Sequence, residues 1–382
     1  MSKTKSVMNR VFIMFVSMLL ILAIAVSVLI WYSVFDISGI TFYNDEPISQ
    51  IVPYEDRIYI ITQNGNGYMA GNYNSSSRKY RNSESYHNKK IGIPSPVMFF
   101  NGSISEILPY DSNGTLFLSN DNELYDLYDF DVTKIADNVI DADVKGTTEK
   151  RYYIVDSKLN LYETNEMGAS RFISAEITQV RVYRDKIFAL FTNGNLCELD
   201  ASLTSDNPIV STIYENVKTF DICDTSMRYI DGNYVFDDED AIAAPLLNVL
   251  TQKGELYAKG AYSLLPCTRS ISVHPEPYFM ENWSLIGENV SEFSLASMGT
   301  IIKFNDNTCA YFGFDSNTSK NSNYSFGYKE ILLNNVTDVY ATSLHVCVKT
   351  KEGFYIWGRY LIYDKAGDTH DIFSGEPILI AP

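Results

Sequence analysis

The chain has 382 residues, a formal net charge of −17 at pH 7 and 46% apolar residues, with 28 Tyr and 21 Phe. This length allows two ordinary domains or one large all-β domain, and the abundance of aromatic side chains favours β-strands. The excess of acidic residues argues against a nucleic-acid partner, because phosphate recognition requires a concentration of Lys and Arg that this chain lacks. We therefore expect a solvated acidic surface and no nucleic acid among the partners.

A long apolar segment lies near the N-terminus. Val11–Phe35 contains 25 residues without a charge, which is long enough to cross a hydrocarbon core of about 30 Å. Basic residues precede it and acidic residues follow it, so the positive-inside rule places the N-terminus in the cytoplasm. We expect a cytoplasmic N-terminus at residues 1–10, a transmembrane signal anchor in contact with the lipid bilayer at 11–35, a linker at 36–46 and an extracytoplasmic domain at 47–382.

A cleaved signal peptide is the alternative interpretation of this segment. Its apolar region is normally about 7–15 residues long and ends at a small-residue cleavage site. Here the apolar run is longer, and Ala23-Ile24-Ala25, its A-x-A sequence, lies inside it. The pattern therefore favours an uncleaved anchor and a single-pass membrane protein.

The outer region contains a repeated unit. Each copy has an apolar lead that often ends in Asn-Val, then alternating strands separated by turns with Gly or Asn, where a positive φ is inexpensive. The copies begin near Ile48, Ile104, Lys134, Ile173, Pro208, Trp283 and Tyr328. One small sheet cannot bury both of its faces, whereas radial packing of seven such sheets does so. We therefore predict an all-β fold, a seven-bladed β-propeller preceded by one transmembrane helix.

The C-terminal segment resembles the leads of the repeated units. Glu376–Ala381 contains Pro-Ile-Leu-Ile, similar to the lead at Pro208, and no further unit follows it. We expect this segment to be the outermost strand of the first blade, so that it joins the two ends of the domain.

The last repeated unit resembles a known family. Val339-Tyr340-Ala341 precedes His345-Val-Cys-Val, Gly353 provides a turn, and Tyr355-Ile-Trp-Gly358 follows. This segment resembles a repeat of the regulator of chromosome condensation family, although Thr342 stands where that family has a glycine. The resemblance implies a seven-bladed propeller and protein-binding loops. Chromatin binding and nucleotide exchange do not carry over, because the chain is acidic and is expected to face away from the cytoplasm.

The five cysteines do not form a recognisable metal or disulfide pattern. Their spacing contains no C-x-x-C pair and no zinc-type His partner, so we expect neither a metal nor a cofactor. Cys197, Cys309 and Cys347 lie in alternating apolar segments, which favours buried strand thiols over disulfide bonds.

Catalytic motifs are absent from the sequence, and two polar insertions are the candidate binding loops. The first contains a dense acidic cluster, Asp231, Asp237, Asp238, Glu239 and Asp240, whose spacing matches no calcium-loop template. The second is a polar stretch in Gly71–Lys90 that includes Tyr73, Arg78 and Tyr80.

These observations favour a membrane-tethered extracytoplasmic module that binds a protein or a surface glycan through propeller loops. Two alternatives are open. The first is a carbohydrate-active hydrolase or lyase with a carboxylate site in the central channel, which requires two carboxylates about 5–9.5 Å apart. The second is a structural subunit of an envelope complex, for which an exposed apolar patch would be expected.

Overall fold

The computed structural model describes residues 46–54, 57–71, 97–111, 114–128, 131–146, 149–183, 186–200, 208–223, 228–230, 233–235, 245–262, 278–314, 326–342, 345–363 and 369–381. Val11–Phe35, the predicted membrane anchor, lies outside these ranges. Among the described residues, no helix has the length and hydrophobicity needed to cross a bilayer.

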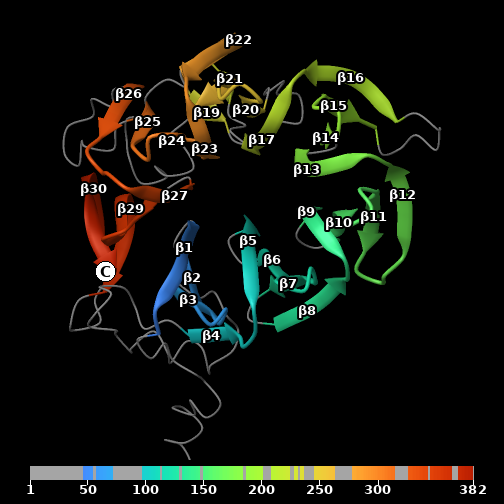
Figure 1. The fold of residues 1–382 in the computed structure, drawn as a ribbon, viewed down its shortest axis with the longest axis horizontal. Coiled ribbons are helices and arrows are strands. Elements are labelled where there is room, and N and C mark those ends of the chain that lie inside the picture. Colours follow the sequence, from blue (N-terminus) through green and yellow to red (C-terminus); the bar gives the residue numbers. More distant parts are fainter. Residues whose placement is uncertain are drawn as a thin grey trace, which may run out of the picture.

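The described strands form seven four-stranded antiparallel sheets arranged as blades around a central channel (Figure 1). Blade one contains β1 (Ile48–Tyr54), β2 (Arg57–Thr62), β3 (Gly67–Gly71) and β4 (Val97–Phe100). Blade two contains β5 (Ile104–Asp111), β6 (Gly114–Ser119), β7 (Leu124–Tyr128) and β8 (Asp131–Ala136). Blade three contains β9 (Val139–Lys145), β10 (Arg151–Asp156), β11 (Leu161–Asn165) and β12 (Ser170–Ser174). Blade four contains β13 (Ile177–Tyr183), β14 (Lys186–Phe191), β15 (Leu196–Leu199) and β16 (Ile209–Tyr214).

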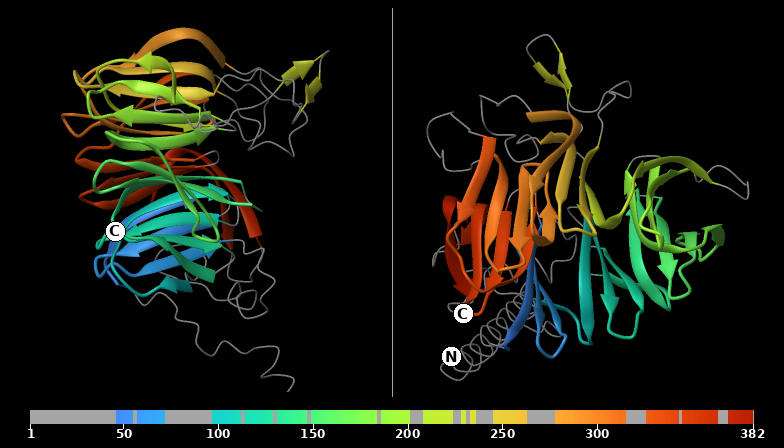
Figure 2. Two further views of the ribbon diagram at one scale, coloured as in Figure 1. Left: turned by 90° about the vertical axis from the view of Figure 1, so that its right-hand side faces the viewer. Right: turned by 45° about the horizontal axis from the view of Figure 1, so that its top comes forward.

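The remaining three blades complete the ring. Blade five contains β17 (Val217–Cys223), β20 (Leu246–Thr251), β21 (Leu256–Tyr262) and β22 (Tyr278–Gly287). Blade six contains β23 (Val290–Leu295), β24 (Gly299–Phe304), β25 (Cys309–Phe314) and β26 (Phe326–Ile331). Blade seven contains β27 (Val336–Ala341), β28 (His345–Thr350), β29 (Gly353–Tyr363) and β30 (Thr369–Ala381). A separate hairpin of β18 (Arg228–Ile230) and β19 (Asn233–Val235) projects from one side of the disc (Figure 2). The prediction of a seven-bladed propeller is confirmed.

In five of the seven copies the blade boundary differs from the predicted repeat by one strand. The leads near Lys134, Ile173, Pro208, Trp283 and Tyr328 belong to the outermost strand of the preceding blade, whereas those at Ile48 and Ile104 are innermost strands. Where the Asn-Val pair occurs, it is the turn that enters the next innermost strand. Asn138, Asn216, Asn289 and Asn335 adopt φ values between 57° and 60° at this turn, a conformation that Asn tolerates better than most residues. The following Val begins the innermost strand, as at Val217 and Val290.

Neighbouring blades are joined by a repeated backbone hydrogen bond. The first N–H of an innermost strand donates to a carbonyl in the hairpin turn of the preceding blade, as from Val217 to Gly194 and from Val290 to Gly254, both at 2.9 Å. The same bond links Ile104 to Gly65 and Val336 to Asn307. Positive φ at the acceptor residue turns its carbonyl toward the next blade, which explains the Gly and Asn residues in these turns.

The core lies between the blades. The buried apolar side chains form clusters that each join two neighbouring blades, so that both faces of every sheet are covered. Cys197, Cys309 and Cys347 are buried in strands of this core, which confirms the prediction of buried strand thiols.

The predicted closure by strand exchange is wrong. The C-terminal strand β30 pairs with β29 of its own blade, for example Tyr355 with Leu379, while blade one is completed by its own β4. The segment thus has the same role as the lead at Pro208, which is part of the outermost strand of the blade before it. Blades seven and one meet instead through packing of Ile51 and Ile60 against Cys347 and Ile356.

Candidate functional site

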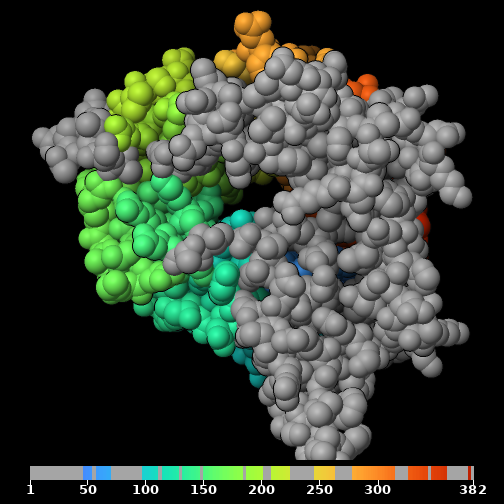
Figure 3. All heavy atoms as spheres, turned by 180° about the vertical axis from the view of Figure 1, so that it is seen from behind, coloured from blue at the N-terminus to red at the C-terminus, as the bar shows by residue number. Residues whose placement is uncertain are grey.

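The central channel contains a cavity at the C-terminal ends of the innermost strands. The cavity has a volume of about 520 Å³, and residues of all seven innermost strands line it. Viewed from the side opposite to that of Figure 1, the disc is hollowed near its centre (Figure 3). A volume of this size is within the range of small-ligand sites in proteins.

A β-bulge places polar side chains at the same point of every innermost strand. The strand register slips between the first and third residues of each innermost strand. The third residue is polar in all seven strands: Gln50, Glu106, Asp141, Gln179, Thr219, Glu292 and Asp338. The fifth residues are Val52, Leu108, Asp143, Arg181, Asp221, Ser294 and Tyr340. A bulge redirects side chains and is common beside functional sites.

These side chains satisfy the open edge of the neighbouring innermost strand. An innermost strand is the edge of its sheet, and its outward N–H groups have no ladder partner. Asp141 Oδ2 accepts a hydrogen bond from the Val180 N–H, and Asp143 Oδ2 accepts one from the Val182 N–H, both at 2.6 Å. The Ser294 hydroxyl accepts in the same way from the Ala341 N–H at 2.9 Å. Part of the polar ring therefore joins one blade to the next.

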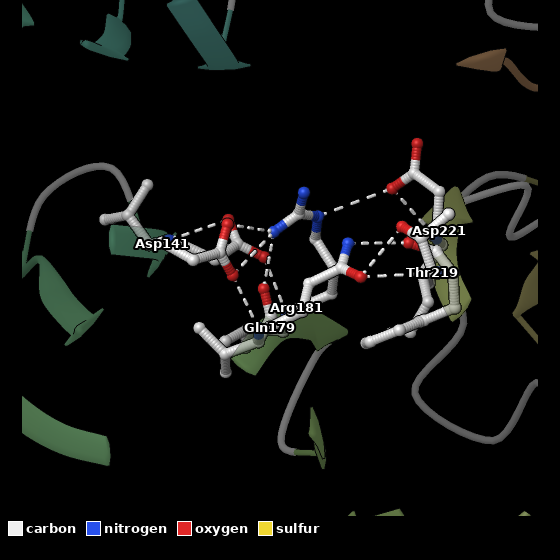
Figure 4. A network of polar contacts seen from close by, with 11 residues as sticks. Asp141, Gln179, Arg181, Thr219 and Asp221 are labelled. Carbon is white, nitrogen blue, oxygen red and sulfur yellow. Dashed lines mark hydrogen bonds and ion pairs between the residues drawn. The ribbon is translucent and has the colours of Figure 1, made fainter. Parts of the chain in front are cut away.

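Arg181 is at the centre of a charged network in blades three to five. Its Nη1 lies 3.0 Å from Asp141 Oδ1, and its Nε lies 3.5 Å from Asp221 Oδ1. Figure 4 shows the guanidinium between these two carboxylates. The side chains of Asp141 and Arg181 are only 11% and 19% exposed, so this pair is shielded from water, whereas that of Asp221 is 35% exposed. Through these two ion pairs, Arg181 links three consecutive blades.

Gln179 extends the same network beside Arg181. Its Oε1 accepts from the Thr219 hydroxyl at 2.9 Å, and its Nε2 donates to the Phe220 carbonyl at 2.8 Å (Figure 4). The amide side chain therefore bonds both a side chain and the backbone of blade five, which fixes its orientation.

Loss of solvation raises the pKa values of the channel carboxylates. For Asp143 this effect raises the pKa from 3.8 to about 6, although Arg181 and two backbone N–H donors oppose it. The pKa of Glu106 is raised by loss of solvation and by the charge of Asp141, and those of Asp141 and Asp221 are also raised by loss of solvation. Burial lowers the pKa of Arg181, but the surrounding carboxylates together raise it by more, so the guanidinium stays charged.

The opposite wall of the cavity carries little charge. Val52 and Pro53 line it from blade one, Leu108 and Tyr110 from blade two, and Tyr340 from blade seven. The Gln50 amide donates to the Tyr340 hydroxyl across the boundary of blades one and seven. At the fifth position of the innermost strand, the channel thus has a charged arc in blades three to five and an uncharged arc in blades six, seven, one and two. Glu106 of blade two, at the third position, also lines the cavity, beside the charged arc.

The cavity opens on the face that carries the long connections. Successive strands of a blade are antiparallel, so the first and third strands run in the same direction and end on the same face of the disc. The longest connections on that face join Gly71 to Val97, Cys223 to Leu246, Tyr262 to Tyr278 and Phe314 to Phe326. The other face has short turns, such as the one between Thr251 and Leu256. We call these two sides the loop-bearing face and the short-turn face.

The predicted binding-loop residues lie outside the described residues. These are Asp231, Asp237, Asp238, Glu239 and Asp240 in the connection from β17 to β20, and Tyr73, Arg78 and Tyr80 in the connection from β3 to β4. Both connections are attached to the loop-bearing face. Within the described part of the chain, no group of three or more His, Cys, Asp or Glu side chains is placed to hold a metal ion.

The channel residues were missed from the sequence, because Glu106, Asp143, Arg181 and Asp221 come from four separate strands. Alignment of the seven innermost strands with one another nevertheless gives a signal for these residues. The third residue of the innermost strand is polar in every copy, whereas the fourth is apolar in every copy. A column that is polar in every copy of a repeated strand points to a shared axis.

Comparison with known proteins gives a similarity of fold. Neither a protein-family model nor a curated protein matches this chain. Among solved structures, it is similar to PorZ, a surface component of the type-IX secretion system of Porphyromonas gingivalis, with 12% identity and a TM-score of 0.47 over 87% of this chain and 39% of PorZ. It is also similar to Prp20p of Saccharomyces cerevisiae, with 9% identity and a TM-score of 0.45 over 77% and 80% of the two chains. BamB of Moraxella catarrhalis is similar as well, with 12% identity and a TM-score of 0.41 over 88% of this chain and 91% of BamB. The predicted kinship with the regulator of chromosome condensation repeats stays a prediction.

Proposed function

We propose that this chain is a membrane-tethered, extracytoplasmic binding module that recognises a protein or surface glycan with its loop-bearing face. The observation that carries the proposal is topological. The mouth of the central cavity and the strand ends that flank the longest connections lie on one face of the disc. Binding residues are concentrated on loops held by a rigid scaffold, and a propeller is such a scaffold.

The tether is proposed from the sequence of the N-terminal segment. Val11–Phe35 is apolar throughout, and the preceding Lys and Arg residues favour a cytoplasmic N-terminus. A cysteine placed at the exposed residue Glu166 should react with a membrane-impermeant maleimide on intact cells. The parent chain serves as the background control. Labelling that occurs only after the cells are permeabilised would place the propeller on the cytoplasmic side and contradict this part of the proposal.

The recognition face is tested by photo-crosslinking on intact cells. A photoreactive residue at Met167, which is 93% exposed on the loop-bearing face, should capture a specific partner. The same photoreactive residue placed at position Lys253, which is exposed on the short-turn face, should capture much less of that partner. An unrelated propeller on the same anchor controls for chance contacts. Equal capture at both positions, or capture at Lys253 alone, would contradict the assignment of the face.

A carbohydrate-active hydrolase or lyase is the second candidate function. The observation in its favour is that Glu106 and Asp143 line one cavity and both have raised pKa values, because loss of solvation disfavours their charged forms. Against it, both oxygens of Asp143 already accept backbone hydrogen bonds, from Val144 and Val182. Release of reducing ends from cell-surface polysaccharide by the full chain, abolished by Glu106→Gln, would support this candidate over the binding module.

A further inference from the structure

The charges that line the central cavity are unbalanced. Among the described residues that line it, Glu106, Asp143 and Asp221 stand against the single guanidinium of Arg181, which also pairs with Asp141 beside the cavity. Arg181 forms its ion pairs with Asp141 and Asp221. Glu106 and Asp143 form no ion pair within the described part of the chain; the charge of Arg181 acts on both, but Arg181 also pairs with Asp141 and Asp221, so the carboxylates remain in excess.

A second and independent feature of the same cavity points to a ligand. Ser297 follows β23 and lines the cavity, and the residue is only 1% exposed. Its hydroxyl has no hydrogen-bond partner among the described residues. A buried hydroxyl without a partner costs about 1–3 kcal/mol, which a bound polar group can recover. Glu106 likewise lacks a hydrogen-bond donor among these residues.

The uncharged arc suits the apolar part of a cation. Leu108 and Val52 offer aliphatic surface, and Tyr110 and Tyr340 line the same wall with aromatic rings. A cation is attracted to the face of an aromatic ring, and the alkyl stem of a long basic side chain packs on apolar surface. A lysine or arginine side chain matches both arcs, because its stem is apolar and its end is a charged hydrogen-bond donor.

We propose that the central cavity binds a lysine or arginine side chain of a protein partner, with the cationic group at Glu106 and Asp143 and the stem against Tyr340 and Leu108. This inference rests on the proposed function, since it names the chemical group that the loop-bearing face recognises. Charge-assisted hydrogen bonds in such a cavity are stronger than at the exposed surface.

Binding should depend on pH because the cavity acids must be ionised. The groups that face the cation are Glu106 on β5, Asp143 on β9, Arg181 on β13 and Asp221 on β17, with Asp141 behind Arg181. The pKa of Asp143 is about 6, so a cation that binds near neutral pH displaces a proton from part of the population. Affinity should therefore fall as the pH decreases below about 6.

The test is calorimetric titration of the full chain in detergent with the peptide acetyl-Gly-Gly-Lys-Gly-Gly-amide. A peptide with norleucine in place of lysine keeps the alkyl stem and removes the charge. Loss of one charge-assisted hydrogen bond corresponds to an affinity loss of about tenfold or more. We expect at least this loss for the norleucine peptide, for Glu106→Gln with the lysine peptide, and for the lysine peptide at pH 5 compared with pH 7.5.

Matched variants make the result specific. Glu166→Gln removes the same charge from the loop-bearing face outside the cavity, and it should bind the lysine peptide as the parent chain does. Glu106 makes no hydrogen bond to a described residue, so its glutamine variant should keep the thermal midpoint of the parent. Asp143→Asn is the second variant and should weaken binding in the same direction. Equal binding of the lysine and norleucine peptides, or unchanged affinity in Glu106→Gln, would overturn the inference.

Two further outcomes separate this inference from the proposed function. If a neutral oligosaccharide binds and the lysine peptide does not, the ligand is a glycan and the inference is overturned. If Glu106→Gln captures the partner at Met167 with undiminished yield, the cavity assignment is overturned and the recognition face stands. Absence of any specific partner at Met167, together with cavity binding of the lysine peptide, counts against the proposed function alone.

Discussion

The charged and uncharged arcs of the channel occupy equivalent places in the fold but line the cavity with different chemistry. Blades three, four and five contribute Asp143, Arg181 and Asp221 from the fifth residue of the innermost strand. Blades one and two contribute Val52 and Leu108 from the same position. The backbone, the bulge and the turn before the strand are repeated in both arcs, so the fold alone does not require this difference.

This difference distinguishes the polar side chains that join neighbouring blades from those that are available to a ligand. Each innermost strand is a sheet edge, and one polar side chain per blade is sufficient to join it to its neighbour, as Gln50 joins Tyr340. Blade three supplies two such acceptors, Asp141 and Asp143. The second carboxylate exceeds the structural requirement, and it is the one that lines the cavity.

Removal of the guanidinium should produce the largest effect on stability. Arg181→Met leaves Asp141 shielded from water without its cation, and loss of one partner of a buried ion pair costs about 3–5 kcal/mol. Chemical denaturation of the full chain at pH 7.5 measures this loss. The loss should be smaller at pH 5, because Asp143 is then partly protonated. Arg151→Met is the control, since that side chain is 58% exposed and its ion pair with Glu163 is worth less than about 1 kcal/mol. A similar loss of unfolding free energy in both variants would show that the ion pairs of the charged arc contribute no more than an exposed surface pair.

The charged arc should also give a distinctive pH dependence of folding. The pKa of Asp143 is raised from 3.8 in the unfolded chain to about 6 in the folded one, so the folded state binds the proton more tightly between these values. Its contribution to stability is therefore greatest below pH 4, decreases as the pH rises, and is lost above pH 6. Roughly 1–3 kcal/mol is expected across this window.

The measurement is a urea denaturation series between pH 4.5 and 7.5 on the parent chain and on Asp143→Asn. Groups whose pKa is lowered by hydrogen bonds, such as Asp306 with its Thr308 partner, act in the opposite direction and contribute equally to both chains. The difference between the two chains therefore isolates Asp143. Parallel curves for the parent and the variant would show that Asp143 is solvated like an ordinary surface acid.

The fold could be predicted from the sequence more completely than the site. Alternating strands with Gly and Asn turns gave the correct number of blades, because those patterns depend on local backbone preferences such as the positive φ of Asn216 and Gly194. The blade boundaries and the position of β30 depend on which strands pair, and pairing is decided by packing between distant segments. The cavity depends on convergence of four strands, so no local motif contains Glu106 and Arg181 together.

On the uncharged arc, loss of a single hydrogen bond should have a moderate effect. Tyr340→Phe removes the acceptor of the Gln50 amide at the boundary of blades seven and one and should cost about 1 kcal/mol. The Lys349 Nζ also donates to the Ser49 carbonyl across this boundary, so the variant tests how much one of these polar contacts contributes to closing the ring. Thr219→Val is the matched change on the other side of the channel, where it removes the bond to Gln179. A much larger loss for Tyr340→Phe than for Thr219→Val would mean that the ring depends on this bond for closure.

The smallest expected effect compares one ring position in blades two and six. Glu106 and Glu292 are both the third residue of an innermost strand, but Glu292 pairs with Lys303 at 3.0 Å, whereas Glu106 has no such partner among the described residues. Glu292→Gln should therefore destabilise the chain by about 0.2–1 kcal/mol, the usual value of a partly exposed pair. Glu106→Gln should be neutral or slightly stabilising at pH 7.5, because it removes a poorly solvated charge. Denaturation midpoints of the two variants, measured side by side, give the sign of each change. Destabilisation by Glu106→Gln equal to that by Glu292→Gln would mean that Glu106 has a structural partner in the folded chain, and the cavity would then lose its free acceptor for a cation.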